Sequence, residues 1–575
     1  MALRSNANLI RWMHVTPWRQ DIESLDRLGL MMAMPAGDAE GDVDGHQWQE
    51  RLDLMRDAII YNKNSPSIFF YESGNHGITE QHMQDMKDIR DTYDPYGGRA
   101  AGSREMLNSS IAEYGGEMLY INKALDTPLW QMEYSRDEGI RKYWDNFTAP
   151  YHQDQSYALE WDRNQDSHAV ENVVRWNEYY QQRPGRGLRC NAGGVNIIFS
   201  DSNTHYRGSQ NYRTSGEVDA MRLPKDGYYA HQVMWDKWVD IERPTAHIIG
   251  HWNYNTSTVK DVYVVSTADR VELKLNGKSL GNGTQSDRFL FTFPQVQWAS
   301  GEIAAYGYNA TSGKSITSDR KSTTGQSASI RLFANTSPLG FRASGTDVAL
   351  IDVEVVDSAG IRVPTALDTI TFSLSGEAEW RGGIAVGRSD NYILSKTLPV
   401  ENGVNRFSGL ASASLVLQST PFLSSNVLSL ELPSNGLPSD LSRGPTPLGA
   451  SYTVSRKTLT VSSVIAGSSE DTAEETYDDD ETTIWRSNSS TSTAWIRYQL
   501  AASATVNAVN IKFRSFKSTH AISVSVDDTV VWSGRSTAGL GYWTAEFNAT
   551  EGSTVQINSL SGALEITEAE LYGPI

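Results

Sequence analysis

The first 215 residues alternate helical periodicity with short apolar runs, and this alternation constrains the fold more than any other feature. The segment TPWRQDIESLDRLGL predicts a helix with Thr16 as its N-cap. Two further helices are predicted from apolar residues at helical spacing: Trp48, Leu52, Met55 and Ile59, then Met83, Met86, Ile89 and Tyr93. Between the helices lie the runs LGLMMAMP, SPSIFFYESG, GRAAGS, TPLWQMEYS and GGVNIIFSD, which are typical of parallel strands buried on both faces. Repeated β-then-α units predict an α/β barrel or a doubly wound sheet.

The texture changes after about residue 215, where all-β patterns take over. Asn276-Gly277 lies between alternating apolar residues and predicts a type I′ hairpin, and residues 326–435 alternate with period two. A chain of 575 residues exceeds the roughly 250–300 at which one core stops growing, so several domains are expected. The predicted domains are a barrel over 1–215, β-sandwiches over 216–322 and 323–436, a linker over 437–452, and a last all-β domain over 453–575.

Charge and composition exclude several classes of partner. The chain has 69 acidic and 50 basic residues, a formal charge of −19, so nucleic acid and anionic membrane surfaces are not expected partners. Its single cysteine, Cys190, excludes an internal disulfide and a cysteine-rich metal site. No apolar run approaches the roughly 18 residues of a membrane span, and MALRSNANLIRWM has no hydrophobic signal region. If the protein is exported, its signal lies upstream of Met1.

Barrel enzymes carry their functional side chains at the carboxyl ends of the strands. Two places with carboxylates meet that rule: residues 71–76, which follow SPSIFF, and Glu133, which follows TPLWQM.

Several motifs, in chain order, resemble glycoside hydrolase family 2. NANLIRWMHVTPWRQDIESLDRLGLMM is similar to the family's second strand and helix, and RDAIIYNKNSPSIFFYESGNH to its fourth strand. LDTPLWQMEYSRDEG resembles its seventh strand, and the segment from GGVNIIFSD, interrupted by RGSQNY, its eighth. RLPKDGYYAHQVMW resembles the exit from the barrel. The resemblance implies a (β/α)8 barrel of the TIM type followed by three all-β sandwich domains, with the first barrel strand missing from this chain.

By this resemblance, Glu133 is the nucleophile that forms a covalent glycosyl-enzyme, and Asn75 contacts the sugar 2-hydroxyl. His76 occupies the place of the family's acid/base glutamate. Four readings stay open: His76 acts as acid and base, the barrel is inactive and only binds, another acid such as Glu72 has taken over, or the histidine was introduced. Glu72 by strand alternation points away from the pocket and favours a structural role.

Further substrate-binding candidates surround this pair. Arg11, which could support the nucleophile by a charge-assisted hydrogen bond, and His14 lie in the strand IRWMHVTP. Trp144 and Trp161, in an aromatic-rich loop, could stack on sugars, although such aromatics more often serve packing. The remaining pocket candidates are Asp201, His205 and Glu113. No cluster in this half has convincing metal-ligand spacing, and no cofactor is expected.

The trailing segments resemble the modules that follow the barrel in bacterial family 2 enzymes. Residues 230–310 resemble a small β-sandwich, and 326–435 an immunoglobulin-like domain. SSEDTAEETYDDDETTIWRS, AWIRYQL and ELYG resemble a discoidin-type jelly roll. Such a domain implies binding of galactose-type sugars, and Asp478 and Asp480 lie where it could hold a structural calcium ion.

The resulting hypothesis is a bacterial, periplasmic or extracellular, retaining exo-β-glycosidase. A β-galactosidase acting on oligosaccharides from a complex polysaccharide is favoured, with β-glucuronidase and β-mannosidase as alternatives. The rival hypothesis is a catalytically silent barrel that binds carbohydrate or serves as a scaffold. The expected partner is an oligosaccharide or polysaccharide, and the resemblance also allows a homo-oligomer.

Overall fold

The chain is described by a computed structural model that divides into two compact units. The described residues are 1–36, 41–118, 127–134, 138–141, 143, 162–181, 191–202, 213–239, 244–337, 347–375, 378–384, 393–411, 416–420, 456–478, 483–514, 518–536 and 542–574. One unit comprises Met1–Ala7, Ser135–Val173 and Ile197–Leu448, and the other comprises Asn8–Tyr134, Val174–Asn196 and Gly449–Ile575.

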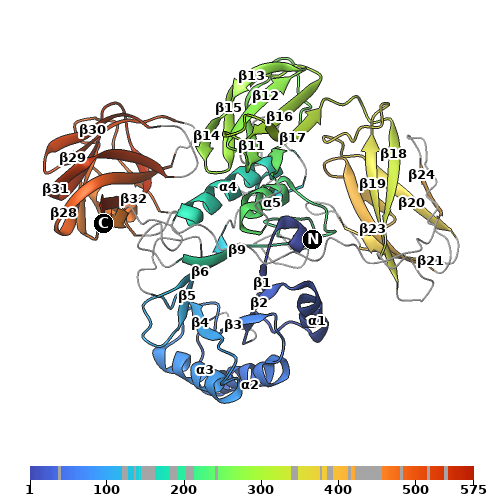
Figure 1. Cartoon of the computed structure of the whole chain (residues 1–575), viewed down its shortest axis with the longest axis horizontal. Helices are drawn as coiled ribbons and strands as arrows, with labels where there is room; N and C mark the ends of the chain where they lie inside the picture. The colour runs from blue at the N-terminus through green and yellow to red at the C-terminus, as the bar shows by residue number, and fades with distance from the viewer. Residues whose placement is uncertain are drawn as a thin grey trace. The chain divides into compact units, whose positions relative to one another are not determined.

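A parallel sheet organises the first part of the second unit and confirms the barrel that the sequence predicts. Its described strands are β1 (Leu9–Arg11), β2 (Met31–Pro35), β3 (Ile68–Glu72), β4 (Ala100–Arg104), β5 (Tyr114–Met118), β6 (Leu129–Tyr134) and β9 (Asn191–Asn196). They follow one another in this order, and every pairing is parallel (Figure 1). Strands β1 and β9 come close together without pairing, so this barrel of seven described strands is nearly closed.

Three helices follow the first strands as the β-then-α pattern predicts. They are α1 (Arg19–Leu28), α2 (Gly45–Asn62) and α3 (Glu80–Tyr93), and they bury Leu25, Met55 and Met83 among other residues. Helix α1 begins at Arg19, later than predicted. The Thr16 hydroxyl does not cap it and donates to the Pro35 carbonyl at 3.2 Å. The backbone N–H of Trp18 is instead satisfied by the Asp21 carboxylate. Thr16 as the N-cap is therefore wrong.

The barrel interior is filled by large side chains below the carboxyl ends of the strands. Phe70 meets Tyr114 and Trp130 edge to face, with ring centroids 4.9 and 4.6 Å apart. Met132 and Ala33 complete this cluster. Strand β5 was missed in the sequence because its YGGEM segment carries two glycines. A Cβ at Gly116 would lie 2.3 Å from the Met132 sulfur. This glycine is therefore needed for core packing and does not mark a turn.

The other unit holds the remaining barrel-side elements and antiparallel sheets. The short elements are a 3-10 turn at Ala2–Ser5, the parallel pair β7 (Glu138–Ile140) and β8 (Asp162–Asn164), and helices α4 (Gln165–Gln181) and α5 (Asp226–Val239), of which α4 crosses the division between the units. One sheet is β10 (Ala246–Ile248), β11 (Val259–Ser266), β15 (Leu290–Gln297) and β14 (Thr284–Asp287). A second is β13 (Lys278–Asn282), β12 (Arg270–Leu275), β16 (Glu302–Tyr308) and β17 (Ser315–Ser322).

The predicted hairpin joins β12 to β13. Asn276 and Gly277 both have positive φ, 51° and 78°, as a type I′ turn requires, so this prediction is confirmed. Two further sheets follow: β18 (Ser329–Asn335), β19 (Val348–Val356), β23 (Val404–Ala411) and β21 (Ala378–Gly383), then β22 (Thr397–Pro399), β20 (Thr369–Ser375) and β24 (Val416–Thr420). Their shared core includes Ile351, Phe372 and Phe407.

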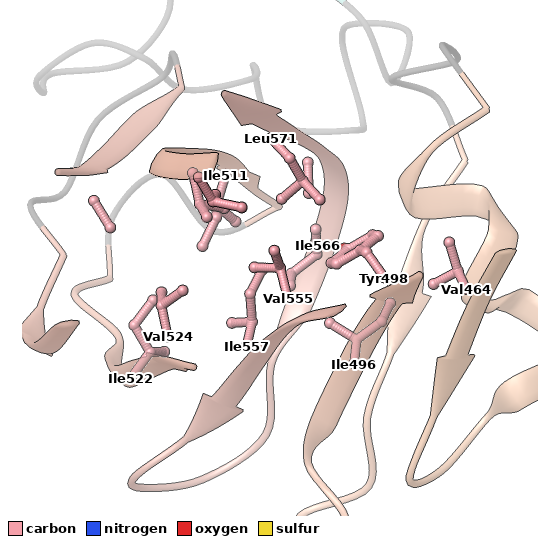
Figure 2. Close-up of a cluster of buried hydrophobic side chains, with 14 of the residues drawn as sticks. Val464, Ile496, Tyr498, Ile511, Ile522, Val524, Val555, Ile557, Ile566 and Leu571 are labelled. Carbon is pink, nitrogen blue, oxygen red and sulfur yellow. The ribbon is translucent and has the colours of Figure 1, made fainter. Parts of the chain in front are cut away.

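The C-terminal segment forms a β-structure with its own core. Its strands are β25 (Arg456–Thr458), β26 (Val461–Ala466), β27 (Trp485–Arg486), β28 (Trp495–Phe513), β29 (Ala521–Val526), β30 (Thr529–Arg535), β31 (Trp543–Ser559) and β32 (Glu565–Pro574), with a 3-10 turn at Glu470–Thr476. Figure 2 shows the interior, where Ile496, Val555 and Ile566 lie among other apolar side chains. The predicted linker, 437–452, lies outside the described residues. Among the helices that are described, none is long and apolar enough to cross a membrane.

Candidate active site

Polar side chains gather at the carboxyl ends of β1, β3, β4 and β6. Arg11, Glu72 and Arg104 are the last residues of their strands, and Glu133 is the last but one of β6. Strand register places Glu72 opposite Gly102 and Glu133 opposite Met118. Parallel strands end at the same rim of a barrel, so these charged groups meet where barrel enzymes carry their chemistry.

Arg11 joins two of these groups, Glu72 and Glu133, through one buried guanidinium. Its Nε and Nη2 donate to the two oxygens of Glu72 at 2.8 and 2.5 Å, and its Nη1 donates to Oε1 of Glu133 at 3.1 Å. Burial alone would lower the pKa of Arg11, but the carboxylates of Glu72 and Glu133 outweigh it, so the pKa lies above its ordinary value. The arginine is therefore a permanent cation that fixes both acids.

The Glu133 carboxylate lies between two guanidinium groups. Besides Arg11, Arg104 approaches the same oxygen, with Nη1 3.7 Å from Oε1. Glu133 is 5% exposed, and both guanidinium groups lie next to its Oε1. No hydrogen bond among the described residues of the barrel rim involves Oε2.

Asn75 and His14 are both brought to Arg11. Arg11 Nη2 donates to the Asn75 side-chain oxygen at 2.9 Å and lies 3.4 Å from His14 Nδ1. Because the Asn75 oxygen accepts from arginine, its Nδ2 is the side of the amide that can donate. Asn75 thus shares the guanidinium of Arg11 with Glu133 and keeps an amide donor.

His76 lies in the turn after β3 with its side chain 45% exposed. Arg104 Nη2 is 2.9 Å from His76 Nδ1 and 3.3 Å from Nε2. The turn is held from β4, because Ser103 Oγ donates to the carbonyls of Gly74 and His76 at 2.8 and 3.0 Å. A cation, rather than a second carboxylate, is thus the nearest charged group to the ring.

Glu72 is 1% exposed, and both of its carboxylate oxygens accept hydrogen bonds from Arg11. A carboxylate with a bidentate arginine partner is a poor proton donor, because protonation would break a charge-assisted pair. This geometry favours a structural role for Glu72 over the role of a relocated acid.

The other predicted residues have different described partners or lie outside the described residues. Asp201 belongs to the other unit, where its Oδ1 accepts from Lys225 at 2.8 Å and from the Gly216 N–H. Burial raises the pKa of Asp201 to about 7, although Lys225 opposes the shift. Glu113 precedes β5, at the opposite end of the strand, and pairs with Arg90. Trp144, Trp161, His205 and Asp480 lie outside the described residues, and Asp478 accepts a hydrogen bond from Thr483 at 2.9 Å.

Two residues of the cluster were missed in the sequence, Arg104 and Glu105. The signal was available, because Arg104 and Glu105 directly follow the predicted strand GRAAGS, at the position where barrel strands present functional groups. Among the described residues no group of three or more histidine, cysteine or acidic side chains is arranged to hold a metal ion.

Comparison with known proteins gives matches in sequence and in structure. Residues 332–421 match the glycoside hydrolase family 2 C-terminal domain 5, and residues 257–317 match a domain of unknown function (DUF4982). A β-glucuronidase of Formosa agariphila is 34% identical over 464 residues, which cover 75% of this chain and 45% of that protein. A β-galactosidase of Bacteroides ovatus is 32% identical over 162 residues, 28% of this chain and 18% of that protein.

A solved structure of a β-glucuronidase from glycoside hydrolase family 2 aligns with 97% of this chain and 64% of its own, with a TM-score of 0.69 and 25% identity. The matched part of the chain spans less than half the length of each of the two relatives matched by sequence. Family profile, relatives and fold agree with the motifs of residues 56–76 and 125–139, and the chain belongs to glycoside hydrolase family 2.

Proposed function

We propose that the site at the rim of the barrel hydrolyses β-glycosides by double displacement, with Glu133 as the nucleophile. The observation that carries the proposal is the Glu133 carboxylate, which is buried and held through Oε1 by Arg11 and Arg104. Such a carboxylate is charged, fixed in direction and keeps one oxygen for the anomeric carbon.

The reaction would proceed in two steps. A Glu133 oxygen attacks the anomeric carbon, the glycosidic C–O bond breaks, and the leaving oxygen takes a proton. Water then attacks the anomeric carbon of the glycosyl ester, gives up a proton, and releases Glu133. We assign the proton transfers to His76, which stands in the acid/base position. A protonated imidazole can donate the proton, and the neutral ring can receive one from water.

The sugar is proposed from the relatives. A relative named β-glucuronidase matches 75% of this chain, which favours a β-glucuronide as the substrate. A β-galactoside is the second candidate, because a relative with that name is 32% identical over a shorter segment. In either case the proposed natural substrate is an oligosaccharide from a complex polysaccharide.

One observation favours the rival hypothesis of a silent, carbohydrate-binding barrel. Arg104 is only a donor, so the His76 nitrogen that it contacts at 2.9 Å must accept and therefore carries no proton. A ring fixed in that state cannot donate the proton that the leaving oxygen needs in the first step. The barrel would then bind the sugar without cleaving it.

The deciding experiment uses aryl β-glucuronides, β-galactosides and β-mannosides whose leaving group needs no acid. We expect a burst of aryl alcohol from one sugar, absent in Glu133→Gln and kept in the control Glu23→Gln on the exposed face of α1. A folded protein that binds the sugars but releases no aryl alcohol from any of them would establish the silent barrel instead.

A separate proposal concerns the C-terminal domain as a carbohydrate-binding module. Its half-buried Trp532 and Trp543 have ring centroids 4.9 Å apart, and Phe513 stacks on His520 at 4.2 Å. Clustered aromatic faces suit the apolar face of a sugar. Weaker retention of Trp532→Ala on an immobilised galactan, with retention unchanged in Glu133→Gln, would support it, and unchanged retention of both would contradict it.

A further inference from the structure

We propose that Glu105 is the positioning residue that allows a histidine to replace the acid/base glutamate, through a Glu105–His76 pair. The inference rests on the proposed function, because it explains how His76 would perform both proton transfers. It starts from the missed segment after β4, where Glu105 has its carboxylate beside the His76 ring.

The backbone and the carboxylate of Glu105 each take part in a hydrogen bond, although the side chain is half exposed. Glu105 has a positive φ of 62°, a region that non-glycine residues seldom adopt, and its N–H donates to the Gly116 carbonyl at 2.8 Å. Its Oε2 accepts the Gly77 N–H at 3.2 Å, which ties the side chain to the turn that carries His76. Its Oε1 then lies 3.6 Å from His76 Nδ1.

His76 Nδ1 therefore faces one group that can only donate and one that, as a carboxylate, can only accept. Arg104 Nη2 is 2.9 Å away and Glu105 Oε1 is 3.6 Å away. When Nδ1 is bare, it accepts from Arg104 and the ring proton lies on Nε2. When Nδ1 carries a proton, the acceptor that the described residues offer it is the carboxylate of Glu105. The charged groups around the ring in the described structure are these two, whose Arg104 Nε and Glu105 Oε1 lie 3.5 Å from each other, and, through Arg104, Glu133.

Only the second arrangement supports both chemical steps. An imidazolium whose Nδ1–H is bound by Glu105 gives its Nε2 proton to the leaving oxygen as the C–O bond breaks. The ring is then neutral with a bare Nε2, which can take a proton from the attacking water. A ring bound to Arg104 has the opposite tautomer and can do neither. Glu105 thus selects the productive tautomer, as the aspartate does for the histidine of a serine protease.

The kinetic test compares the full-length protein with Glu105→Gln, Glu105→Asp and the surface control Glu23→Gln. Each is assayed on aryl glycosides with good and poor leaving groups, from pH 4.5 to 9. We expect Glu105→Gln to lose about 10²-fold in kcat/KM on the poor leaving group and less than about threefold on the good one. Its pH profile should shift, and Glu105→Asp should recover part of the loss. Equal losses on both substrates with an unchanged pH profile, or no loss, would overturn the inference.

A spectroscopic test does not depend on turnover. ¹⁵N NMR of histidine-labelled protein, assigned with His76→Gln, reports which ring nitrogen carries the proton. We expect the wild-type ring to show the tautomer protonated on Nδ1, and Glu105→Gln to shift His76 toward the tautomer protonated on Nε2. Identical spectra and titrations in both proteins would refute the pairing. If no glycoside is cleaved, the proposed function fails, and this measurement still decides the role of Glu105.

Discussion

Arg11 and Glu72 form a bidentate ion pair between the ends of β1 and β3, with both side chains 2% exposed. Because the same guanidinium binds Glu133, its removal would leave the buried Glu72 carboxylate without this bidentate partner and Glu133 without one of its two arginine contacts. The guanidinium of Arg11 therefore contributes both to the stability of the barrel rim and to the orientation of Glu133, the proposed nucleophile.

Replacing Arg11 should destabilise the barrel. We expect Arg11→Met to cost about 3–5 kcal/mol, because a buried charge that loses its partner keeps its desolvation penalty. The double variant Arg11→Met/Glu72→Gln should recover part of this loss without recovering activity. Thermal unfolding followed by calorimetry checks both, with the exposed Arg19→Met as the control. A thermal midpoint unchanged in Arg11→Met would contradict the assigned role.

Removing the His76 ring should separate the two halves of the proposed mechanism. We expect His76→Ala to form the glycosyl-enzyme from an activated aryl glycoside at a nearly normal rate. It should lose about 10²–10⁴-fold in turnover of a methyl glycoside, whose leaving group requires a proton. Added azide, a nucleophile that needs no base, should restore the second step. Equal loss on both substrates would instead place the acid elsewhere.

His251 should make the other unit sensitive to acid. Burial, then Lys260, lowers the pKa of His251 to about 3, against an ordinary value near 6.5. The unfolded chain therefore takes up a proton below about pH 6.5 that the folded protein refuses. Stability is full above that pH and falls as the pH drops toward 3, by at most about 1.4 kcal/mol per unit. Comparison of thermal midpoints at pH 7 and pH 5 should show a flatter response in His251→Gln than in wild type or in the exposed His46→Gln.

Arg141 should stabilise the contact between the sheet of β18–β23 and the segment that carries Asp219. Its side chain is 1% exposed and donates to the Asp219 carboxylate at 2.8 Å and to the backbone carbonyls of Glu401 and Val404. We expect Arg141→Met to lower the thermal midpoint of this unit and to speed proteolysis within residues 347–411. Adding Asp219→Asn should reverse part of the effect, and wild-type resistance in the single variant would rule out the contact as a source of stability.

The fold was largely predictable because buried parallel strands leave a strong pattern. The runs that contain Ile68–Glu72 and Leu129–Tyr134 are apolar, bounded by turn residues, and form strands as predicted. Strand β5 was not predictable in this way. Its Gly115 and Gly116 are required because a Cβ there would collide with Leu107 and Met132, and the sequence alone does not show these tertiary contacts.

The site was predictable in part for a related reason. Glu133, Asn75 and Arg11 could be identified by motif and by position at strand ends, and the structure brings all three together. Arg104 and Glu105 could have been identified by their position at the end of a strand, but their contact with the His76 ring could not, because it depends on the register of β3 against β4. Local sequence contains no record of that register.

The fork of Arg11 across three strand ends also has an evolutionary consequence. Most enzymes can drift toward a new substrate by accepting a mutation that weakens the fold a little and then repairing it elsewhere. Here one side chain fastens β1 to β3 and orients the acid of β6, so a mutation at this position damages folding and chemistry together. Selection can therefore reshape the loops around the rim, but it has little freedom at the centre.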